Sequence, residues 1–263
     1  MPKKLNIYKV KDKAESYGKD KGLLPNIPFR MLVVGKSHLS GKTNFTTNIL
    51  LNQDFYRGDF LGEDIYLVSP SIKIDNKLKL IVKELNIPSS NCFSDYVEEE
   101  METLYEVLEE DYKECIREKK KPSPKLIFFD DLGFTGQLRG KRFGIINKIV
   151  CNGRHINLSS IFCLQSITQA LKSCRENVST LIIFNMTNKQ LELVEEEHNY
   201  LKCKKAFYNM FRELTYDPHS FMVINYSNSR KDMYMNKHFQ PVCVCPFQKK
   251  CENIELDNIY EKK

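Results

Sequence analysis

A Gly-Lys-Thr triplet that follows a short apolar run is the feature that most constrains this chain. The apolar run is Met31–Val34, and the triplet is Gly41-Lys42-Thr43. A buried strand that ends in such a glycine-bearing loop can hold a triphosphate. The loop amides point at phosphate oxygens, the lysine reaches the β- and γ-phosphates, and the threonine hydroxyl binds magnesium. We therefore predict a nucleotide site at the end of this strand.

The loop departs from the usual pattern by one residue. Gly35 and Gly41 are separated by five residues, whereas the usual spacing is four. This extra residue leaves the role of Gly35 open and can change how the α- and β-phosphates are held. The predicted nucleotide-binding residues are Gly35, Ser40, Gly41, Lys42, Thr43 and Asn44.

Two adjacent carboxylates support the nucleotide prediction. Leu126–Phe129 is a run of four large apolar residues, which indicates a strand buried on both faces, and Asp130 and Asp131 follow it. Open α/β sheets bind ligands at the carboxyl ends of their strands. We assign Asp130 to the magnesium ion, together with Thr43, and Asp131 to the attacking water. The alternative is a solvated turn after a core strand.

Composition excludes several classes of protein. The 263 residues, 41% of them hydrophobic and 28% charged, suit one globular domain with small appendages. No apolar run approaches the roughly 20 residues that span a bilayer, and the first residues lack an apolar signal core. Nine cysteines without framework spacing suit a reducing compartment. The net charge of +6 permits a polyanionic partner without requiring one.

Apolar runs and helical spacings alternate along the chain, which predicts an α/β fold with a mostly parallel central sheet flanked by helices. The last strands form a C-terminal β-hairpin addition. Strands are expected near 31–34, 64–68, 126–131, 158–164, 180–184, 220–226 and 232–235. Helices are expected near 45–51, 78–85, 101–115, 143–150, 167–174, 190–197 and 204–214. The predicted division is a basic arm over 1–27, an ATPase domain over 28–236 and a tail over 237–263.

The two ends of the chain each leave an alternative open. The basic arm is interpreted either as a soluble tail or as a DNA-touching segment. The tail contains His238, Cys243, Cys245 and Cys251, which could hold zinc. Because Cys-x-Cys lacks the usual ligand spacing, free cysteines are the preferred interpretation.

Gln165 ends a predicted strand that neighbours the Asp130-Asp131 strand. A neutral amide at this place can contact both a γ-phosphate oxygen and the attacking water. It can equally satisfy a loop carbonyl, and the sequence does not separate these roles.

Five motifs taken in order resemble the genome-packaging ATPases of large DNA viruses, poxviruses included, and of virophages and self-synthesising transposons. These belong to the FtsK/HerA class of P-loop NTPases, whose fold is RecA-like. The resemblance covers about residues 28–190. The motifs are Gly41-Lys42-Thr43, Asp130-Asp131, Gly153-Arg154-His155, Gln165 and Arg175. One departure is Asp131, where many relatives of the wider class carry glutamate.

The resemblance implies an ATP- and Mg²⁺-dependent translocase that packages double-stranded DNA into a preformed capsid. It implies a homo-oligomeric ring of five or six subunits, with capsid proteins as partners and no membrane. It also implies action inside the host cell, in a viral factory, the cytoplasm or the nucleus, or within the virion. In such rings a neighbour's arginine stabilises charge on the γ-phosphate. Arg175 is the preferred candidate and Arg154 the other.

Basic residues after the acid pair are candidates for DNA contacts in the ring's pore: Arg139, Lys141 and Arg142. Two other functions compete with the translocase. One is a nucleotide-binding scaffold or adaptor in virion assembly, whose stretched loop no longer hydrolyses ATP. The other is a phosphotransferase or small GTPase, which is disfavoured because the guanine-reading Asn-Lys-x-Asp pattern is not evident.

Overall fold

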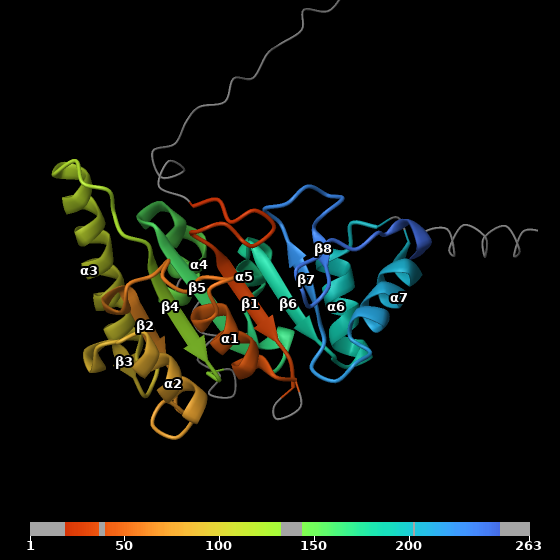
Figure 1. Cartoon of the computed structure of the whole chain (residues 1–263), viewed down its shortest axis with the longest axis horizontal. Coiled ribbons are helices and arrows are strands. Elements are labelled where there is room, and N and C mark those ends of the chain that lie inside the picture. Colours follow the sequence, from red (N-terminus) through yellow and green to blue (C-terminus); the bar gives the residue numbers. More distant parts are fainter. Residues whose placement is uncertain (1–18, 37–39, 133–143, 202, 248–263) are drawn as a thin grey trace, which may run out of the picture.

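An eight-stranded sheet forms the centre of the protein in the computed structural model, which describes residues 19–36, 40–132, 144–201 and 203–247 (Figure 1). The strand order is β3-β2-β4-β5-β1-β6-β7-β8. The strands are β1 (Arg30–Val34), β2 (Ile65–Val68), β3 (Cys92–Phe93), β4 (Lys125–Asp130), β5 (Leu158–Leu164), β6 (Thr180–Phe184), β7 (Phe221–Asn225) and β8 (Tyr234–Met235).

The first six strands in this order pair in parallel with their neighbours, and β7 and β8 continue the sheet in antiparallel pairing. The predicted mostly parallel sheet with a C-terminal hairpin is therefore confirmed. Strand β1 lies between β5 and β6, and β4 lies on the other side of β5. Parallel pairing brings the carboxyl ends of β1, β4 and β5 to one edge of the sheet. The segments after Val34, Asp130 and Leu164 consequently meet there.

Helices cover both faces of the sheet, with α1 and α2 on one face and the longer series from α3 to α7 on the other (Figure 1). The α-helices are α1 (Lys42–Leu51), α2 (Asn76–Glu84), α3 (Glu98–Arg117), α4 (Ile145–Asn152), α5 (Lys172–Asn177), α6 (Asn188–His198) and α7 (Lys204–Leu214). Short 3₁₀ turns are η2 (Gly62–Asp64), η3 (Ser89–Asn91), η6 (Gly153–Ile156) and η7 (Ile167–Gln169). Among the described residues, no helix combines the length and apolar composition needed to cross a bilayer.

The apolar strands supply two hydrophobic cores, one on each face of the sheet. In β1, Leu32 and Val34 belong to the core under α3–α7, whereas Met31 and Val33 belong to the core under α1 and α2. Side chains of a strand alternate between the two faces, so a central strand needs a continuous apolar run. Each such buried side chain contributes roughly 1.5–3 kcal/mol. This double burial holds the strand ends, and the loops that follow them, in place.

The predicted helix over 167–174 is wrong in one respect, because two shorter elements occupy this region. Turn η7 ends before Ala170, and α5 begins after Leu171, and both intervening residues are extended, with ψ of 142° and 147°. A capping box between Ser166 and Gln169 satisfies the N-terminus of η7. The two-residue strand β3 was not predicted, because so short a segment carries no periodicity.

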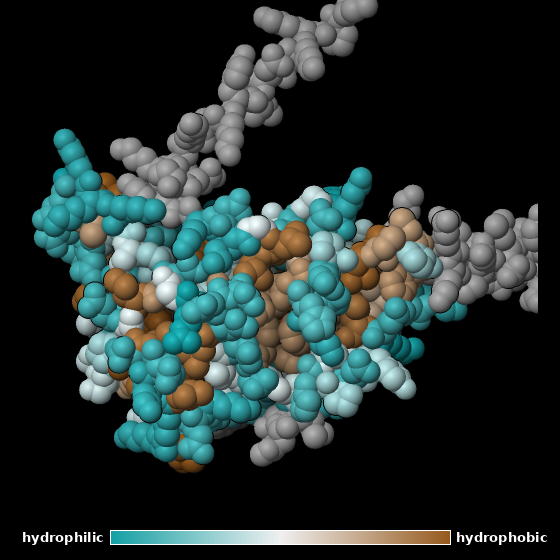
Figure 2. All heavy atoms as spheres, viewed as in Figure 1, coloured by the Kyte–Doolittle hydropathy of each residue, from teal (hydrophilic) through white to brown (hydrophobic). Residues whose placement is uncertain are grey.

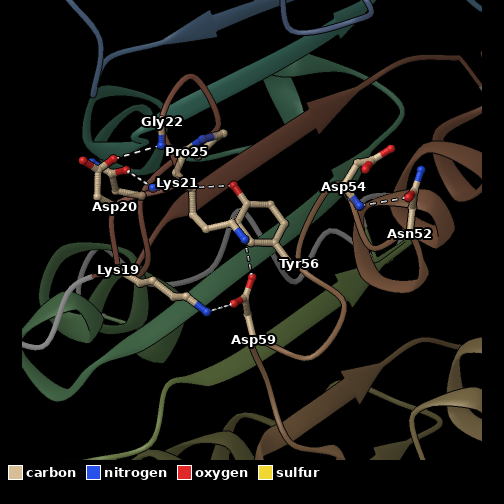
Figure 3. A network of polar contacts seen from close by, with 10 residues as sticks. Lys19, Asp20, Lys21, Gly22, Pro25, Asn52, Asp54, Tyr56 and Asp59 are labelled. Atoms are coloured by element: carbon tan, nitrogen blue, oxygen red, sulfur yellow. Dashed lines mark hydrogen bonds and ion pairs between the residues drawn. The ribbon is translucent and has the colours of Figure 1, made fainter.

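Residues 19–27 pack against the body of the protein. Lys19 and Lys21 both pair with Asp59, the Lys21–Asp59 distance being 2.7 Å (Figure 3). The Tyr56 hydroxyl donates to the Pro25 carbonyl at 2.6 Å. Burial opposes ionisation of Asp59, but hydrogen bonds from the two lysines outweigh it and hold its pKa below the usual value. The packed body therefore begins earlier than the predicted boundary at residue 28, and residues 1–18 lie outside the described part.

The C-terminal segment after β8 also packs on the body. Phe239 joins the core under α1 and α2, and Phe247 joins the core on the other face. Met235 forms an isolated bridge with Pro241. The packed body therefore extends past the predicted boundary at residue 236.

Candidate functional site

One cleft at the carboxyl edge of the sheet brings together the side chains that the sequence assigned to a nucleotide and its metal. Lys42 and Thr43 come from the start of α1, and Asp130 and Asp131 come from the end of β4. The cleft has a volume of about 280 Å³. Its lining residues are Ser40, Gly41, Lys42, Thr43, Ser71, Asp75, Lys77, Asp130 and Asp131. The ammonium, the hydroxyl and both carboxylates thus face a single space.

Two glycines shape the loop between β1 and α1. Gly41 precedes α1 with a φ of +89°, a left-handed conformation that glycine adopts at little cost. Gly35 is required for a different reason, because a Cβ atom there would lie 2.7 Å from the Ser40 Cβ and 2.9 Å from the Phe184 Cβ. Gly35 therefore allows close packing of the loop on β6. Ser37, His38 and Leu39 lie outside the described residues.

Hydrogen bonds tie the start of α1 to the end of β1. The Lys42 ammonium donates to the carbonyl oxygens of Gly35 at 2.6 Å and Lys36 at 3.3 Å. The Ser40 hydroxyl, itself buried, donates to the Lys36 carbonyl at 2.7 Å. Asn44, the remaining predicted ligand, lines a second cavity on the other side of Gly41 rather than this cleft.

Asp130 is a buried carboxylate in an acidic surrounding. Burial, followed by the neighbouring charges of Asp131 and Asp75, raises its pKa to about 7, although Lys42 acts in the opposite direction. Cys163 of β5 is the register partner of Asp130, and its thiol also acts to lower this pKa. The charge of Lys42 therefore does not compensate for burial and for the two neighbouring acids. A cation bound in the cleft would relieve the repulsion.

Asp131 adopts an unusual backbone conformation, with a φ of +56°. Aspartate tolerates this left-handed region better than most residues, and such strain concentrates at functional sites. The Gln165 side-chain amide donates to Asp131 Oδ1 at 2.7 Å. The backbone N–H groups of Gln165 and Ser166 both donate to Gln169 Oε1, at 2.9 and 3.0 Å. Gln165 is therefore held against the second acid by a fixed turn.

The donor set suits magnesium bound with a nucleotide. Mg²⁺ prefers oxygen ligands and is usually bound by one or two carboxylates together with substrate phosphates. Thr43 offers a hydroxyl and Asp130 a carboxylate in the same cleft. No group of three His, Cys, Asp or Glu side chains among the described residues could hold a metal without such phosphates. The residues therefore fit a metal that arrives with its nucleotide.

The sequence-based prediction missed three residues of the cleft, all from the segment after β2. Ser71, Asp75 and Lys77 line it beside Asp130. Asp75 caps α2 by accepting from the Lys77 amide at 2.7 Å and the Leu78 amide at 3.3 Å. The cap pattern could have located the start of α2. Only the pairing of β2 with β4 places this cap at the acid pair.

Arg175 is engaged within its own chain, which does not support the preference for it as a residue acting on a neighbouring subunit. It is 9% exposed, and its Nε and Nη2 atoms donate to the two Glu197 oxygens, both at 2.7 Å. Its Nη1 atom donates to the Ala170 carbonyl at 2.7 Å. These hydrogen bonds raise the pKa of Arg175. The guanidinium therefore links η7, α5 and α6.

Arg154 is exposed, and its Nε atom lies 3.4 Å from the His155 Nε2 atom. It belongs to η6, which precedes β5, whereas Gln165 follows that strand. At about 3.3 Å per residue, the strand separates the two by roughly 20 Å. Neither arginine therefore lies in the cleft of its own chain.

Two predictions reach beyond the described residues. Arg139, Lys141 and Arg142 lie outside them, so their contact with DNA stays a prediction. Cys251 does as well, and the described members of the predicted zinc set form no metal-binding group. Cys243 and Cys245 are free and exposed.

Comparison with models of known protein families shows to which family the chain belongs. The family model described as "Poxvirus A32 protein" matches residues 17–240. The chain belongs to the Poxvirus A32 protein family. No curated protein matches the sequence at a significant level. Within this A32-family protein, the matched region includes every residue of the cleft.

Solved structures resemble the fold. The genome packaging NTPase B204 from Sulfolobus turreted icosahedral virus 2 matches in its sulfate complex with a TM-score of 0.51 and 14% identity, over 78% of this chain and 94% of B204. Its AMP complex matches with a TM-score of 0.52 and 11% identity, over 76% and 93%. EssC (ATPases 2 and 3) from Geobacillus thermodenitrificans matches with a TM-score of 0.52 and 11% identity, over 89% and 45%. At these identities the likeness establishes the fold alone.

Proposed function

We propose that this A32-family protein is an ATP-hydrolysing translocase that packages double-stranded viral DNA into a preformed capsid. The observation that carries the proposal is the single cleft shared by Lys42, Thr43, Asp130 and Asp131. Membership of the family and the fold shared with a viral genome packaging NTPase supply the context. The work takes place inside the infected cell, in the viral factory, the cytoplasm or the nucleus, and within assembling virions.

Each residue of the cleft has a role in this proposal. The Lys42 ammonium binds the β- and γ-phosphates, and the amide-bearing start of α1 favours their negative charge. Thr43 and Asp130 hold Mg²⁺, which neutralises charge on the phosphates. Asp131 orients and polarises the attacking water, and Gln165 holds Asp131 in position through its amide.

Lys42 and Lys77 line the cleft, but no arginine of the described residues does, and an arginine commonly stabilises the charge that develops on the γ-phosphate. We assign that role to Arg154 of a neighbouring subunit, because its guanidinium is exposed while that of Arg175 is bonded to Glu197. Hydrolysis would then require a ring of five or six copies with sites at subunit boundaries. Capsid proteins and duplex DNA are the proposed partners.

An ATPase assay with and without duplex DNA, combined with native mass measurement, tests the proposal. We expect ATP turnover that requires Mg²⁺ and occurs only in the assembled ring. Duplex DNA of any sequence should increase this turnover. A protein that binds ATP but shows no turnover in any assembly state, with or without DNA, would instead be a nucleotide-binding scaffold or adaptor in virion assembly.

A further inference from the structure

An open groove of about 430 Å³ lies between the edge strand β3 and the first turns of α3, at one end of the sheet (Figure 1). Its lining residues are Phe93, Glu99, Glu100, Thr103 and Leu104. The two apolar side chains are half-buried, and the other three are exposed. We propose that residues 3–11 of the same chain dock in this groove. Their lysines pair with the carboxylates of α3, and their apolar side chains pack on Phe93 and Leu104.

The acids of α3 fall into two sets. Helix α3 contains nine acids and only two bases, so its surface carries a net negative charge that attracts a basic partner. In its second half, Glu109, Glu110 and Asp111 each form an ion pair with a described lysine or arginine. At the groove, the Glu99 and Glu100 carboxylates pair with no cation of the described residues. The groove therefore offers two unpaired negative charges.

Apolar side chains accompany these charges. Hydrophilic residues cover most of α3, and hydrophobic residues lie among them (Figure 2). Residues three or four apart share one face of a helix, so Val107 continues the stripe of Glu100 and Leu104. The Val107 side chain is 53% exposed. A partner that fits this face must therefore supply both cations and apolar side chains.

The stretch 3–11 has this composition. It contains four lysines and no acid, and its apolar residues are Leu5, Ile7, Tyr8 and Val10. Each exposed ion pair contributes little by itself. Because the stretch is tethered to the protein that carries the groove, its effective concentration there is high, and several weak contacts suffice to hold it.

The stretch can reach the groove of its own chain. Lys19 forms an ion pair with Asp59, which lies four residues before Glu63. The Glu63 carbonyl accepts from the side-chain amide of Asn91, the residue before β3, at 2.9 Å. Four residues span at most about 14 Å, whereas the eight to sixteen residues that separate 3–11 from Lys19 span up to about 28–56 Å. No second copy is needed for this contact.

A photo-crosslinker in place of Tyr8 tests the contact in the full chain. p-Benzoylphenylalanine keeps an aromatic ring at this position and, on irradiation, links to whatever side chain it touches. Mass spectrometry should find the link at the groove, on Phe93, Thr103 or Leu104, in a product with the mass of one chain. Reversing both exposed groove acids, by Glu99→Lys and Glu100→Lys, should reduce the yield of this link at least about 5-fold. Adding Lys9→Glu and Lys11→Glu to that variant should restore most of the yield, because the charges are complementary again.

Glu114→Lys is the matched control, since Glu114 is an exposed acid of the same helix that does not line the groove. It lies about 15 Å or more along α3 from the groove residues, beyond the distance at which salt screens exposed charges. The yield of the link should therefore stay within about 2-fold at physiological ionic strength. Three outcomes would overturn the proposal: links that map to other surfaces, a product with the mass of two chains, or a yield that the reversal of Glu99 and Glu100 does not reduce.

Discussion

The cleft that is lined by Lys42, Asp130 and Asp131 and the α5–α6 region both contain buried charged side chains, but the two regions arrange these side chains differently. In the cleft, Asp130 is buried beside Asp131 and Asp75, so like charges crowd together. In the α5–α6 region, Arg175 and Glu197 form a bidentate pair with both oxygens satisfied. The carboxylates of the cleft repel one another unless a cation binds between them, whereas the ion pair of Arg175 and Glu197 joins α5 to α6. Whether a buried charge is paired therefore separates the candidate site from structural ion pairs more clearly than residue type does.

The largest effect should come from Asp131→Asn in the cleft. The amide preserves size but cannot take a proton from water, so turnover of the DNA-stimulated ring should fall about 10²- to 10⁴-fold. ATP binding should persist, and the free energy of unfolding should not fall, because asparagine tolerates the positive φ, can still accept from Gln165 and no longer repels Asp130. Steady-state turnover and ATP affinity measured on the same sample check this. Loss of binding together with turnover would place Asp131 among the phosphate or metal ligands.

Arg175→Ala should show the opposite behaviour. Removing it leaves the Glu197 carboxylate largely buried and unpaired, which should lower the free energy of unfolding by about 3–5 kcal/mol. Urea denaturation of the variant and of wild type measures this. Unchanged stability with abolished ring turnover would restore Arg175 as the residue that acts on a neighbour.

The pH dependence of the free energy of unfolding should reveal the raised pKa of Asp130. Its carboxyl ionises near pH 3.8 when unfolded and near pH 7 when folded, so the folded state retains a proton between these values. The free energy of unfolding, measured without nucleotide or magnesium, should therefore fall as pH rises from about 4 to 7, by up to about 4 kcal/mol. Asp130→Asn should lack this component. Parallel curves for the two proteins between pH 4 and 8 would contradict a raised pKa.

His198 should give the reverse slope in the α5–α6 region. Burial lowers its pKa to about 4, and its Nδ1 atom lies 2.6 Å from the Tyr226 hydroxyl. Below about pH 6.5 the unfolded chain binds a proton that the folded protein excludes. Stability should therefore fall as pH decreases from 6.5 to 4, by up to about 3 kcal/mol. His198→Gln, which does not titrate, should remove this slope, as urea denaturation at several pH values would show.

The smallest effect on stability should come from Arg154→Ala. Its exposed side chain pairs with no carboxylate among the described residues, so the free energy of unfolding should stay within about 0.5 kcal/mol. Turnover of the ring should nevertheless fall while the monomer still binds ATP. A matched loss of stability in Arg154→Ala and Arg175→Ala would remove the contrast between the two arginines.

Much of the fold was predictable because its signals are local. Runs such as Leu126–Phe129 indicate doubly buried strands by themselves, and alternation of strands with helical spacings indicates a parallel sheet. Helix α7 has the predicted bounds, 204–214. The region after Gln165 was predicted less well, since the extended backbone of Ala170 and Leu171 interrupts what periodicity alone presents as one helix.

The sequence by itself determined that Lys42, Thr43 and the acid pair would meet, because they follow two strands whose carboxyl ends lie at the same edge of a parallel sheet. Only the tertiary structure decided the rest. It brought Asp75 to the acid pair through the pairing of β2 with β4, and Glu197 to Arg175 across 22 positions of chain. It also placed His219 against Gly41. Such contacts join distant residues without any repeat or spacing, so no local pattern encodes them.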